Sequence, residues 1–374
     1  MRATVMDSSN VPSNLANSVA ERWLVLCSTG LQFLSILSLI EERRTQDAPI
    51  EVDLVLNYRR RQTQRIAEIL PELDIFRNTF LIKDVNIPGL KHALREPEDF
   101  VPRFLGSFRA TRPLAEKLFF GPHLPKDYSD YTDFFVPCSS QVRTWMEARL
   151  PKSCRIHLYE DGIGSYRWDA LPPGVDYCYL FEPDLSAYPS EKVRRVPKLS
   201  ARSASVRRMA QAFCEGKNIR LPPVLYIDQA WGANAVRSTH ASAVQRAMWS
   251  RRLELMESVI QQEGKERCGI LIHPGSKPDE VDFLRRRFGE DIVIDLNGIP
   301  FEVALLHGIH CPEKIYTVTS SAAFYWKVAC DLPVESVKMI FFVDSFRFDH
   351  ACLQGYPRIL QKLRQWYPDL VEIR

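Results

Sequence analysis

The chain has 374 residues, of which 45% are hydrophobic and 25% are charged, and its formal net charge is +3. This length and ordinary globular composition predict about two domains, and the balance of acids and bases argues against a dedicated nucleic-acid-binding protein. The nine cysteines include no Cys-x-x-Cys pair, so neither a zinc site nor a disulfide framework is indicated. A reducing cytoplasm is therefore the expected compartment.

Strands and helices alternate from the start of the regular sequence. Residues 1–20 are polar and are predicted to form a disordered leader. After them the sequence predicts three strands, Trp23–Cys27, Glu51–Leu56 and Thr79–Ile82, with helices between them at Leu31–Arg44 and Arg60–Leu70. The early apolar stretch is interrupted by Ser28-Thr29-Gly30 and further polar residues, so it does not predict a membrane span. This alternation is typical of a parallel sheet covered by helices.

The middle of the chain is less regular. Lys83–Tyr131 is rich in proline and aromatic residues, with a helix expected near Pro113–Phe119, and it either packs irregularly or wraps an acceptor site. Regular elements then return as strands at Phe134–Pro137, Cys154–Tyr159 and Tyr177–Phe181, with a helix at Gln141–Arg149. The basic run Lys192–Arg208 is interpreted as solvated surface; the alternative is a contact with an anionic acceptor or the inner face of a membrane.

A second alternation fills the remaining sequence. Strands are predicted at Val224–Asp228, Gly269–Ile272, Asp291–Ile294, Lys314–Val318 and Val337–Phe342. Helices are predicted at His240–Glu263, Asp279–Phe288, Phe301–Leu306 and Ser321–Cys330, with a terminal helix at Tyr356–Trp366 that packs back across the cleft. We predict two Rossmann-like domains whose parallel sheets face one cleft: residues 21–235 on the acceptor side, 236–345 on the nucleotide side, and a C-terminal helical segment 346–374.

Acidic residues follow one of the predicted strands. The strand Cys154–Tyr159 ends at Glu160-Asp161, and glycines follow at positions 162 and 164. Side chains that follow a strand in an open parallel sheet lie at its carboxyl edge, where such sheets bind ligands. On these residues alone, a solvated acidic turn is the favoured interpretation.

Polar residues occupy corresponding positions in the second half. His273-Pro274-Gly275 follows the strand Gly269–Ile272, and the proline biases His273 toward an extended backbone. Thr319-Ser320-Ser321 precedes a helix, where hydroxyl groups act as caps or bind a phosphate. Glu302 lies in the first turn of a short helix, where it complements the helix dipole or binds a ribose. There is no Walker P-loop, and no Gly-x-Gly-x-x-Gly follows the first strand, so ATP and nicotinamide chemistry fit poorly.

The ordered set Glu160-Asp161-Gly162, His273-Pro274 and Ser320-Ser321 resembles the bacterial sialyltransferases and polysialyltransferases. Those families carry an acidic-acidic-Gly motif, a His-Pro motif and a Ser-Ser or Ser-Thr motif on a GT-B scaffold of two domains. The similar motifs here span about residues 159–330. The first 150 residues share only the general α/β character, and they include the part that would select the acceptor.

The resemblance implies an inverting transferase that moves sialic acid from CMP-sialic acid to a hydroxyl group of a cell-surface glycan, such as lipooligosaccharide or capsule. Asp161 would be the general base, with Glu160 as the competing candidate. His273 would donate to the departing phosphate, within a site that includes Pro274 and Gly275. Ser320 and Ser321 would hold the phosphate oxygens, and Glu302 would bind the ribose. No metal ion or further cofactor is implied, because the leaving group is a monophosphate.

Two alternatives stay open at this point. The first is a transferase for another CMP-linked ulosonic acid, such as Kdo or legionaminic acid, which needs the same base and phosphate site. The second is a non-catalytic glycan- or nucleotide-binding α/β protein, in which the three motifs are only caps and turns. The expected location is cytoplasmic, with peripheral association at the inner membrane face as an option. The acceptor, the linkage and the oligomeric state do not follow from the sequence.

Overall fold

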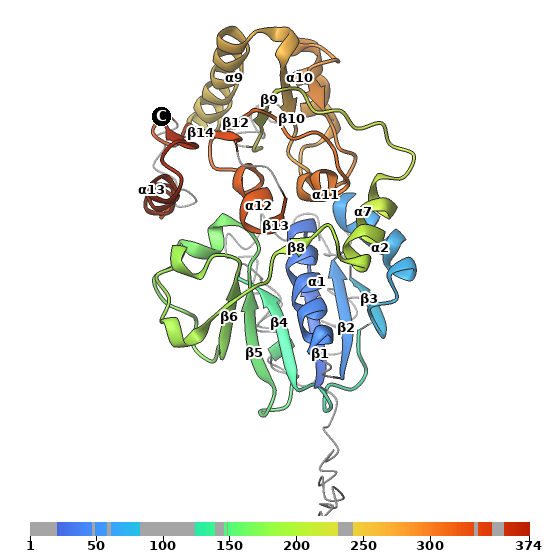
Figure 1. Ribbon diagram of the computed structural model, residues 1–374. Helices are drawn as coiled ribbons and strands as arrows, with labels where there is room; N and C mark the ends of the chain where they lie inside the picture. Colours follow the sequence, from blue (N-terminus) through green and yellow to red (C-terminus); the bar gives the residue numbers. More distant parts are fainter. Residues whose placement is uncertain are drawn as a thin grey trace, which may run out of the picture.

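The structure is a computed structural model that describes residues 21–46, 49–57, 61–82, 124–138, 146–147, 149–230, 242–332, 336–345 and 355–374. The predicted leader, the predicted helix near Pro113–Phe119 and most of the predicted helix Gln141–Arg149 lie outside these ranges. The described chain forms two α/β units, which lie one above the other in Figure 1.

The first unit is built on a seven-stranded parallel sheet with the order β3-β2-β1-β4-β5-β6-β7. Its central strands are buried almost throughout, as expected for strands covered on both faces. α1 lies across one face of this sheet (Figure 1). The strands are β1 (Glu21–Cys27), β2 (Ile50–Asn57), β3 (Asn78–Ile82), β4 (Asp133–Pro137), β5 (Arg155–Tyr159), β6 (Tyr177–Leu180) and β7 (Val193–Arg195).

The second unit is built on a six-stranded parallel sheet with the order β11-β10-β9-β12-β14-β15. Relative to its own first strand, this order repeats the order 3-2-1-4-5-6 found in the first sheet, which is that of a Rossmann fold. The strands are β9 (Val224–Ile227), β10 (Cys268–Leu271), β11 (Val293–Ile294), β12 (Lys314–Thr317), β14 (Lys338–Phe341) and β15 (Val371–Ile373). The prediction of two Rossmann-like domains with parallel sheets is confirmed.

The expected domain boundary at 235/236 needs correction. β9 pairs with β10 and β12 at the centre of the second sheet, so the second unit begins before residue 224 rather than at 236. The segment 346–374 is also more than helical, because β15 pairs with β14 at the sheet edge. Strand–helix alternation shows how many strands there are, but not at which strand a new sheet begins.

Eight helices accompany the two sheets in the described ranges. They are α1 (Gly30–Thr45), α2 (Arg61–Leu73), α7 (Ala204–Cys214), α9 (Ala243–Glu263), α10 (Pro278–Phe288), α11 (Phe301–Leu306), α12 (Ala322–Val328) and α13 (Tyr356–Trp366). Short 3-10 turns occur at η2 (Ile163–Tyr166), η3 (Pro183–Leu185), η4 (Ser190–Lys192) and η5 (Lys265–Arg267). The expected end of α2 before Pro71 is wrong, because the helix continues to Leu73. Pro71 stands in the last turn, so it removes one intrahelical hydrogen bond close to the point where the helix ends.

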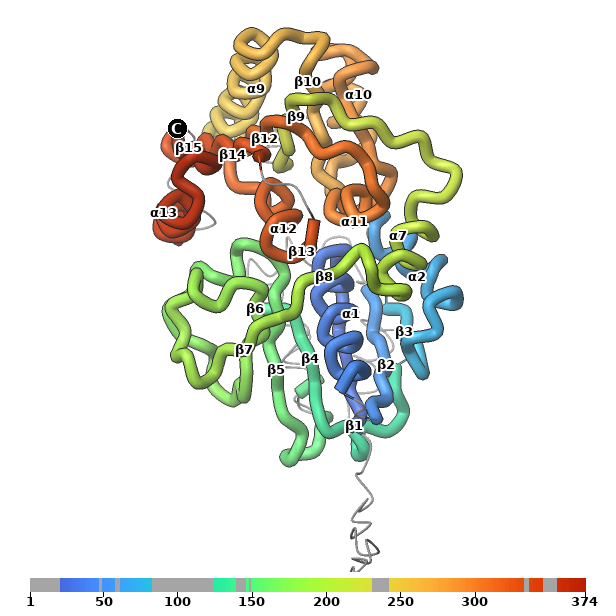
Figure 2. The backbone as a smooth tube through the Cα atoms, in the orientation of Figure 1, coloured from blue at the N-terminus to red at the C-terminus, as the bar shows by residue number. Residues whose placement is uncertain are grey.

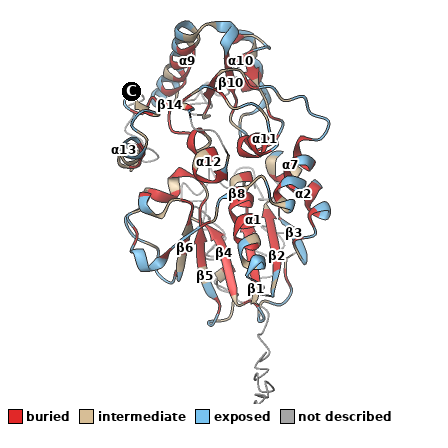
Figure 3. Ribbon diagram, viewed as in Figure 1, coloured by how far each residue is buried: buried red, intermediate tan, exposed pale blue. Residues whose placement is uncertain are grey.

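Apolar packing joins the two units. Figure 2 traces the chain from the first sheet through β8 (Leu199–Ser200) and α7 up to β9. α7 packs against both α2 and α11, and β8 pairs with β13 (Cys330–Asp331) of the second unit. One buried cluster continues from the first sheet through α11 and α12, while a second lies beneath α9 and α10 (Figure 3). The interface is therefore a shared core rather than a loose contact.

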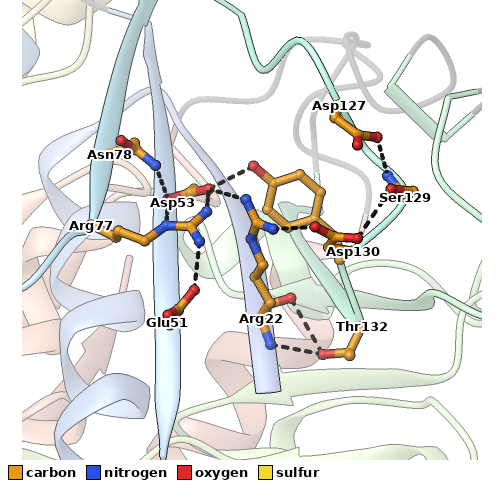
Figure 4. A network of polar contacts seen from close by, with 10 residues as sticks. Arg22, Glu51, Asp53, Arg77, Asn78, Asp127, Ser129, Asp130 and Thr132 are labelled. Atoms are coloured by element: carbon orange, nitrogen blue, oxygen red, sulfur yellow. Dashed lines mark hydrogen bonds and ion pairs between the residues drawn. The ribbon is translucent and has the colours of Figure 1, made fainter. Parts of the chain in front are cut away.

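A buried polar network ties three strands of the first sheet together (Figure 4). Asp53 on β2 is 1% exposed and accepts hydrogen bonds from Arg77, Asn78 and the Tyr131 hydroxyl. Burial opposes ionisation of Asp53, but these hydrogen bonds outweigh that cost and lower its pKa. A buried carboxylate with this many donors fixes the register between β2 and β3.

The C-terminal helix returns to the first unit, as predicted. Arg358 of α13 donates to the Tyr166 carbonyl oxygen at 3.0 Å and forms an ion pair with Asp169 at 2.6 Å. Lys362 donates to the carbonyl oxygen of Asp184. Across the described ranges, no helix is long and apolar enough to cross a membrane.

Candidate functional site

A cavity of about 230 Å³ lies between the two units, at the carboxyl ends of both sheets. Thr29 follows β1 and Asp228 follows β9, so the cavity lies where the strand order reverses in each sheet. Open α/β sheets bind ligands at such switch points. The cavity is smaller than the roughly 300–1,000 Å³ that is usual for ligand sites.

Most of the residues predicted from the sequence line this one cavity. Those that do are Asp161, His273, Pro274, Glu302, Ser320 and Ser321. Two predicted residues are not part of the lining: Glu160, whose side chain is fully buried, and Gly275, whose N–H is bonded to the ring of His273. The structure thus brings residues from three strand ends and from the start of α11 to one place, and it separates the two adjacent carboxyl groups.

The acidic turn presents Asp161 to the cavity. Asp161 Oδ1 accepts a hydrogen bond from Ser165 Oγ at 2.7 Å, and Ser165 Oγ accepts one from the Asp161 N–H at 3.0 Å. Gly162 has a φ of 136°, a conformation that favours glycine. A Cβ atom at position 162 would lie 2.9 Å from Ser321 Oγ of the opposite unit. The glycine is therefore needed both for the turn and for the close approach of the two units.

Glu160 points the other way, into the first unit. Its Oε2 accepts hydrogen bonds from the Tyr166 hydroxyl and from the Phe181 N–H, both at 2.6 Å. Desolvation raises the pKa of Glu160 well above its usual value, against the opposing effect of these two bonds. The interpretation of Glu160 as an alternative base at the cavity is not favoured, because the strand carries its side chain to the interior.

His273 opens a tight turn after β10. Its Nδ1 atom accepts a hydrogen bond from the Gly275 N–H at 3.0 Å. A backbone N–H can only donate, so Nδ1 is the acceptor and the neutral ring carries its proton on Nε2. The Nε2–H of His273 is therefore the hydrogen-bond donor that this ring can offer to a ligand in the cavity.

The two serines differ in their surroundings. Ser321 Oγ accepts a hydrogen bond from the Ile163 N–H of the acidic turn at 3.1 Å, which joins the two units directly. Ser321 does not cap α12 through its side chain, so the capping interpretation is wrong for this residue. Ser320 is buried and its N–H donates to Thr317 Oγ1 at 3.1 Å. Both hydroxyl groups keep a proton that they can donate to an anion in the cavity.

Glu302 forms part of the cavity wall at the start of α11. The side chain is buried, and burial raises its pKa to about 7, although a hydrogen bond from its own backbone N–H acts in the opposite direction. Near neutral pH this group exists in both protonation states. It can accept hydrogen bonds from two hydroxyl groups when it is ionised.

The cavity also contains residues that the sequence analysis did not single out. Asp228 and Asp295 line it from the ends of β9 and β11, and Gln62 lines it from α2. Each aspartate is close to an arginine: Asp295 lies 3.0 Å from Arg61, and Asp228 is bonded to the buried Arg252. These pairs reduce the negative charge that would otherwise repel an anionic ligand. The signal available in the sequence was the position of Asp228 as the last residue of the predicted strand Val224–Asp228, at the carboxyl edge of its sheet.

Within the described part of the chain, no three His, Cys, Asp or Glu side chains are arranged to hold a metal ion. The arrangement offers instead a carboxylate, an imidazole N–H and two hydroxyl groups around one space. Such a set can take a proton from one reactant and stabilise negative charge on another.

No protein-family model matches the chain, and no curated protein matches it in sequence. Among solved structures, it is similar to a sialyltransferase from Photobacterium damsela, with a TM-score of 0.45 and 12% identity over 95% of this chain and 81% of that one. A Photobacterium 2,6-sialyltransferase in a ternary complex with CMP and lactose gives a TM-score of 0.44 and 12% identity over 95% and 78%. The MurG protein of Acinetobacter baumannii gives 0.41 and 9% over 94% and 85%. These likenesses concern the two-domain α/β fold alone.

Proposed function

We propose that the chain is an inverting glycosyltransferase that moves a nonulosonic acid, and specifically sialic acid, from a CMP-linked donor to a hydroxyl group of a cell-surface glycan. The observation that carries the proposal is the convergence of Asp161, His273, Glu302 and the serine pair on one cavity between two Rossmann-like units. Turns that follow strands meet at such a cleft in any case, so the weight of the proposal lies on the residue types that meet there: a carboxylate, an imidazole and two hydroxyl groups. The choice of CMP as the nucleotide and of sialic acid as the sugar rests on the sequence motifs that resemble those of the sialyltransferases.

In this mechanism Asp161 takes the proton from the acceptor hydroxyl as it attacks the anomeric carbon. The Ser165 hydroxyl holds one oxygen of this carboxylate, and Asp161 lines the cavity. The CMP phosphate leaves on the opposite side, where the Nε2–H of His273 and the hydroxyl groups of Ser320 and Ser321 donate to its oxygens. Donors that are already placed where charge develops stabilise the transition state. Glu302 holds the ribose hydroxyls.

The negative charge of the donor is compatible with the carboxyl groups in the cavity. Asp295 is paired with Arg61, and Arg252 offsets part of the charge of Asp228, because the same guanidinium group also faces Glu280. Glu302 is partly protonated near neutral pH, because burial raises its pKa to about 7. A phosphate therefore meets donors from His273 and the serines in a cavity where arginines and partial protonation offset part of the negative charge.

Calorimetry with CMP and with cytidine tests the phosphate site. Hydrogen bonds to a charged group contribute about 1.5–3 kcal/mol each, so Ser320→Ala or His273→Gln should weaken CMP binding by about ten- to a hundredfold and leave cytidine binding unchanged. The exposed Ser258 and His310 of the same unit give matched controls, Ser258→Ala and His310→Gln. If both site variants bind CMP as tightly as the parent chain, the proposed phosphate site is wrong.

Release of CMP then separates the donor classes. The parent chain is incubated with CMP-sialic acid, CMP-Kdo or CMP-legionaminic acid over an array of glycan acceptors. Release from the first donor supports the proposal, and release only from another donor corrects its sugar. A chain that binds CMP but releases none from any donor with any acceptor would be a nucleotide-binding protein.

A further inference from the structure

The turn that carries His273 is closed by its own backbone. The Ser276 N–H donates to the His273 carbonyl oxygen at 2.8 Å, and the Gly275 N–H donates to His273 Nδ1 at 3.0 Å. The ring is thus bonded to the turn on which it stands. Whatever fixes the turn also fixes the direction of the imidazole.

A buried ionic cluster holds this turn from behind. Ser276 Oγ donates to Glu280 Oε1 at 3.2 Å, and Arg252 Nη2 donates to the same oxygen at 2.6 Å. Arg252 Nε donates to Asp228 Oδ1 at 2.7 Å, and Arg252 Nη2 also bonds to the other carboxylate oxygen. The three charged side chains are no more than 1% exposed. The cluster connects the end of β9, α9 and the first turn of α10 with the His273 turn.

The chemistry of the cluster suits a positioning role. One guanidinium group faces two buried carboxylates, and a buried charge is tolerated only when it is well hydrogen-bonded. The Ser276 hydroxyl adds a donor to Glu280, so the hydroxyl is bound in one orientation. Arg252 also lies 4.7 Å from the ring centroid of Trp249, which restricts the guanidinium further. A cluster with so many hydrogen bonds has one arrangement, and it therefore holds the His273 turn in one conformation.

We propose that Ser276, Glu280 and Arg252 are positioning residues that hold His273 with Nδ1 as an acceptor and the Nε2–H directed toward the donor phosphate. The catalytic role of this positioning rests on the proposed function, because the donor phosphate is part of that proposal. The ring geometry does not rest on it, and it can be measured on the protein without any substrate.

Ser276→Ala is the direct test, because it removes only the hydroxyl that joins the turn to the cluster. Arg252→Ala is unsuitable, since it would leave two buried carboxylates without a cation. The full chain is labelled with ¹⁵N-histidine, and the His273 ring signals are assigned by their loss in His273→Gln. The parent chain should show protonated Nε2 and unprotonated Nδ1. Ser276→Ala should show exchange between the two tautomers, and the Ser258→Ala control should show none.

Kinetics complete the test. With CMP-sialic acid, Ser276→Ala should lower kcat by about ten- to a hundredfold while KM for the donor changes little, as expected when a reacting group is misplaced. Glu280→Gln should lower kcat in the same way. Ser276→Ala should keep the melting temperature of the parent chain, which excludes loss of fold as the cause. An unchanged ring tautomer in Ser276→Ala overturns the positioning role, whether or not transfer occurs. If the parent chain holds one tautomer that Ser276→Ala loses, but no donor supports transfer, the positioning role stands and the proposed function is wrong.

Discussion

At the scale of single residues, two adjacent carboxyl groups have opposite environments. Asp161 is half-buried at the cavity, whereas Glu160 is fully buried with its Oε2 held by Tyr166 and the Phe181 N–H. We expect Asp161→Asn to lower transfer by about 10²–10⁴-fold, because general-base assistance is lost. CMP affinity should stay nearly the same, since the carboxylate faces the acceptor. Steady-state kinetics and calorimetry measure the two quantities.

Glu160→Gln is the matched comparison at the neighbouring position. Desolvation raises the pKa of Glu160 well above its usual value, so a neutral amide is a close replacement and most of the activity should remain. Glu160→Ala instead leaves the Tyr166 hydroxyl without its acceptor, and should lower the free energy of unfolding by about 1–3 kcal/mol. A larger loss of turnover in Glu160→Gln than in Asp161→Asn would reverse the two roles.

Glu302 gives a prediction about pH. Burial raises its pKa to about 7, and ribose hydroxyls donate to the ionised form, so cytidine binding should strengthen as pH rises through 7. Below that value, affinity should fall by up to about tenfold per pH unit, and above about pH 8 it should level off. Calorimetry with cytidine, which lacks the phosphate, keeps His273 out of the measurement. Glu302→Gln should bind cytidine more weakly than the parent at high pH, and with no pH dependence.

At the scale of elements, a buried Asp–His pair joins β4 to β5. Asp133 accepts hydrogen bonds from His157 Nε2 at 2.7 Å, from Arg155 and from Thr132. Burial alone would raise the pKa of Asp133, but these three bonds outweigh it and lower the pKa to about 2. The folded pKa is below the unfolded value of about 3.9, so the stability from this group is present above pH 4 and is lost as pH falls toward 2.

This contribution should amount to about 2–3 kcal/mol at neutral pH. Urea unfolding of the parent chain and of Asp133→Asn should therefore give free energies that differ by about that amount at neutral pH and converge between about pH 4 and pH 2. Asp130→Asn is the control, since Asp130 is 65% exposed and its ion pair with Arg22 contributes little. A difference that does not shrink in acid would mean that the pair does not carry this stability.

The same elements show what sequence reasoning could and could not predict. The strands β1, β2, β9 and β10 are short apolar runs between turn residues, and their alternation with helices predicts a parallel sheet directly. The place of β9 in the second sheet depends on pairing with β10 and β12, which no local pattern encodes. Side-chain direction beyond a strand end is equally non-local. The positions of Glu160 and Asp161 at a sheet edge were therefore predictable, while the division of roles between them was not.

At the scale of the whole molecule, the two units meet along a continuous apolar core and a small cleft. α7 and the β8–β13 pair join the units on one side, and α13 crosses back to the first unit. In the cleft the units touch through the Ile163–Ser321 hydrogen bond, the Arg61–Asp295 ion pair and the contact of Gly30 with Pro300. A donor and a glycan together need more room than about 230 Å³. We therefore expect the cleft to open and close about the shared core.

Gly30→Ala tests closure of the cleft without disturbing the folding of either unit. Gly30 begins α1 outside the left-handed region, so alanine introduces no backbone strain there and is a better helix former. A Cβ atom at this position would nevertheless lie 2.5 Å from Cγ of Pro300, a ring atom of the opposite unit that has little freedom to move. The variant should keep its circular dichroism spectrum and its melting temperature. It should give a larger radius of gyration in X-ray scattering, and transfer should fall, because the base and the phosphate site belong to different units.

Gly164→Ala is the matched control for this test. Gly164 lies close to the acidic turn and also outside the left-handed region, but the nearest atom to its Cβ position, the Tyr356 hydroxyl, is 3.9 Å away. That is an ordinary contact, so scattering and turnover should equal those of the parent chain. If Gly30→Ala also scatters and turns over like the parent, α1 yields locally to the added methyl group. Approach of the two units at Gly30 and Pro300 is then not what assembles the site.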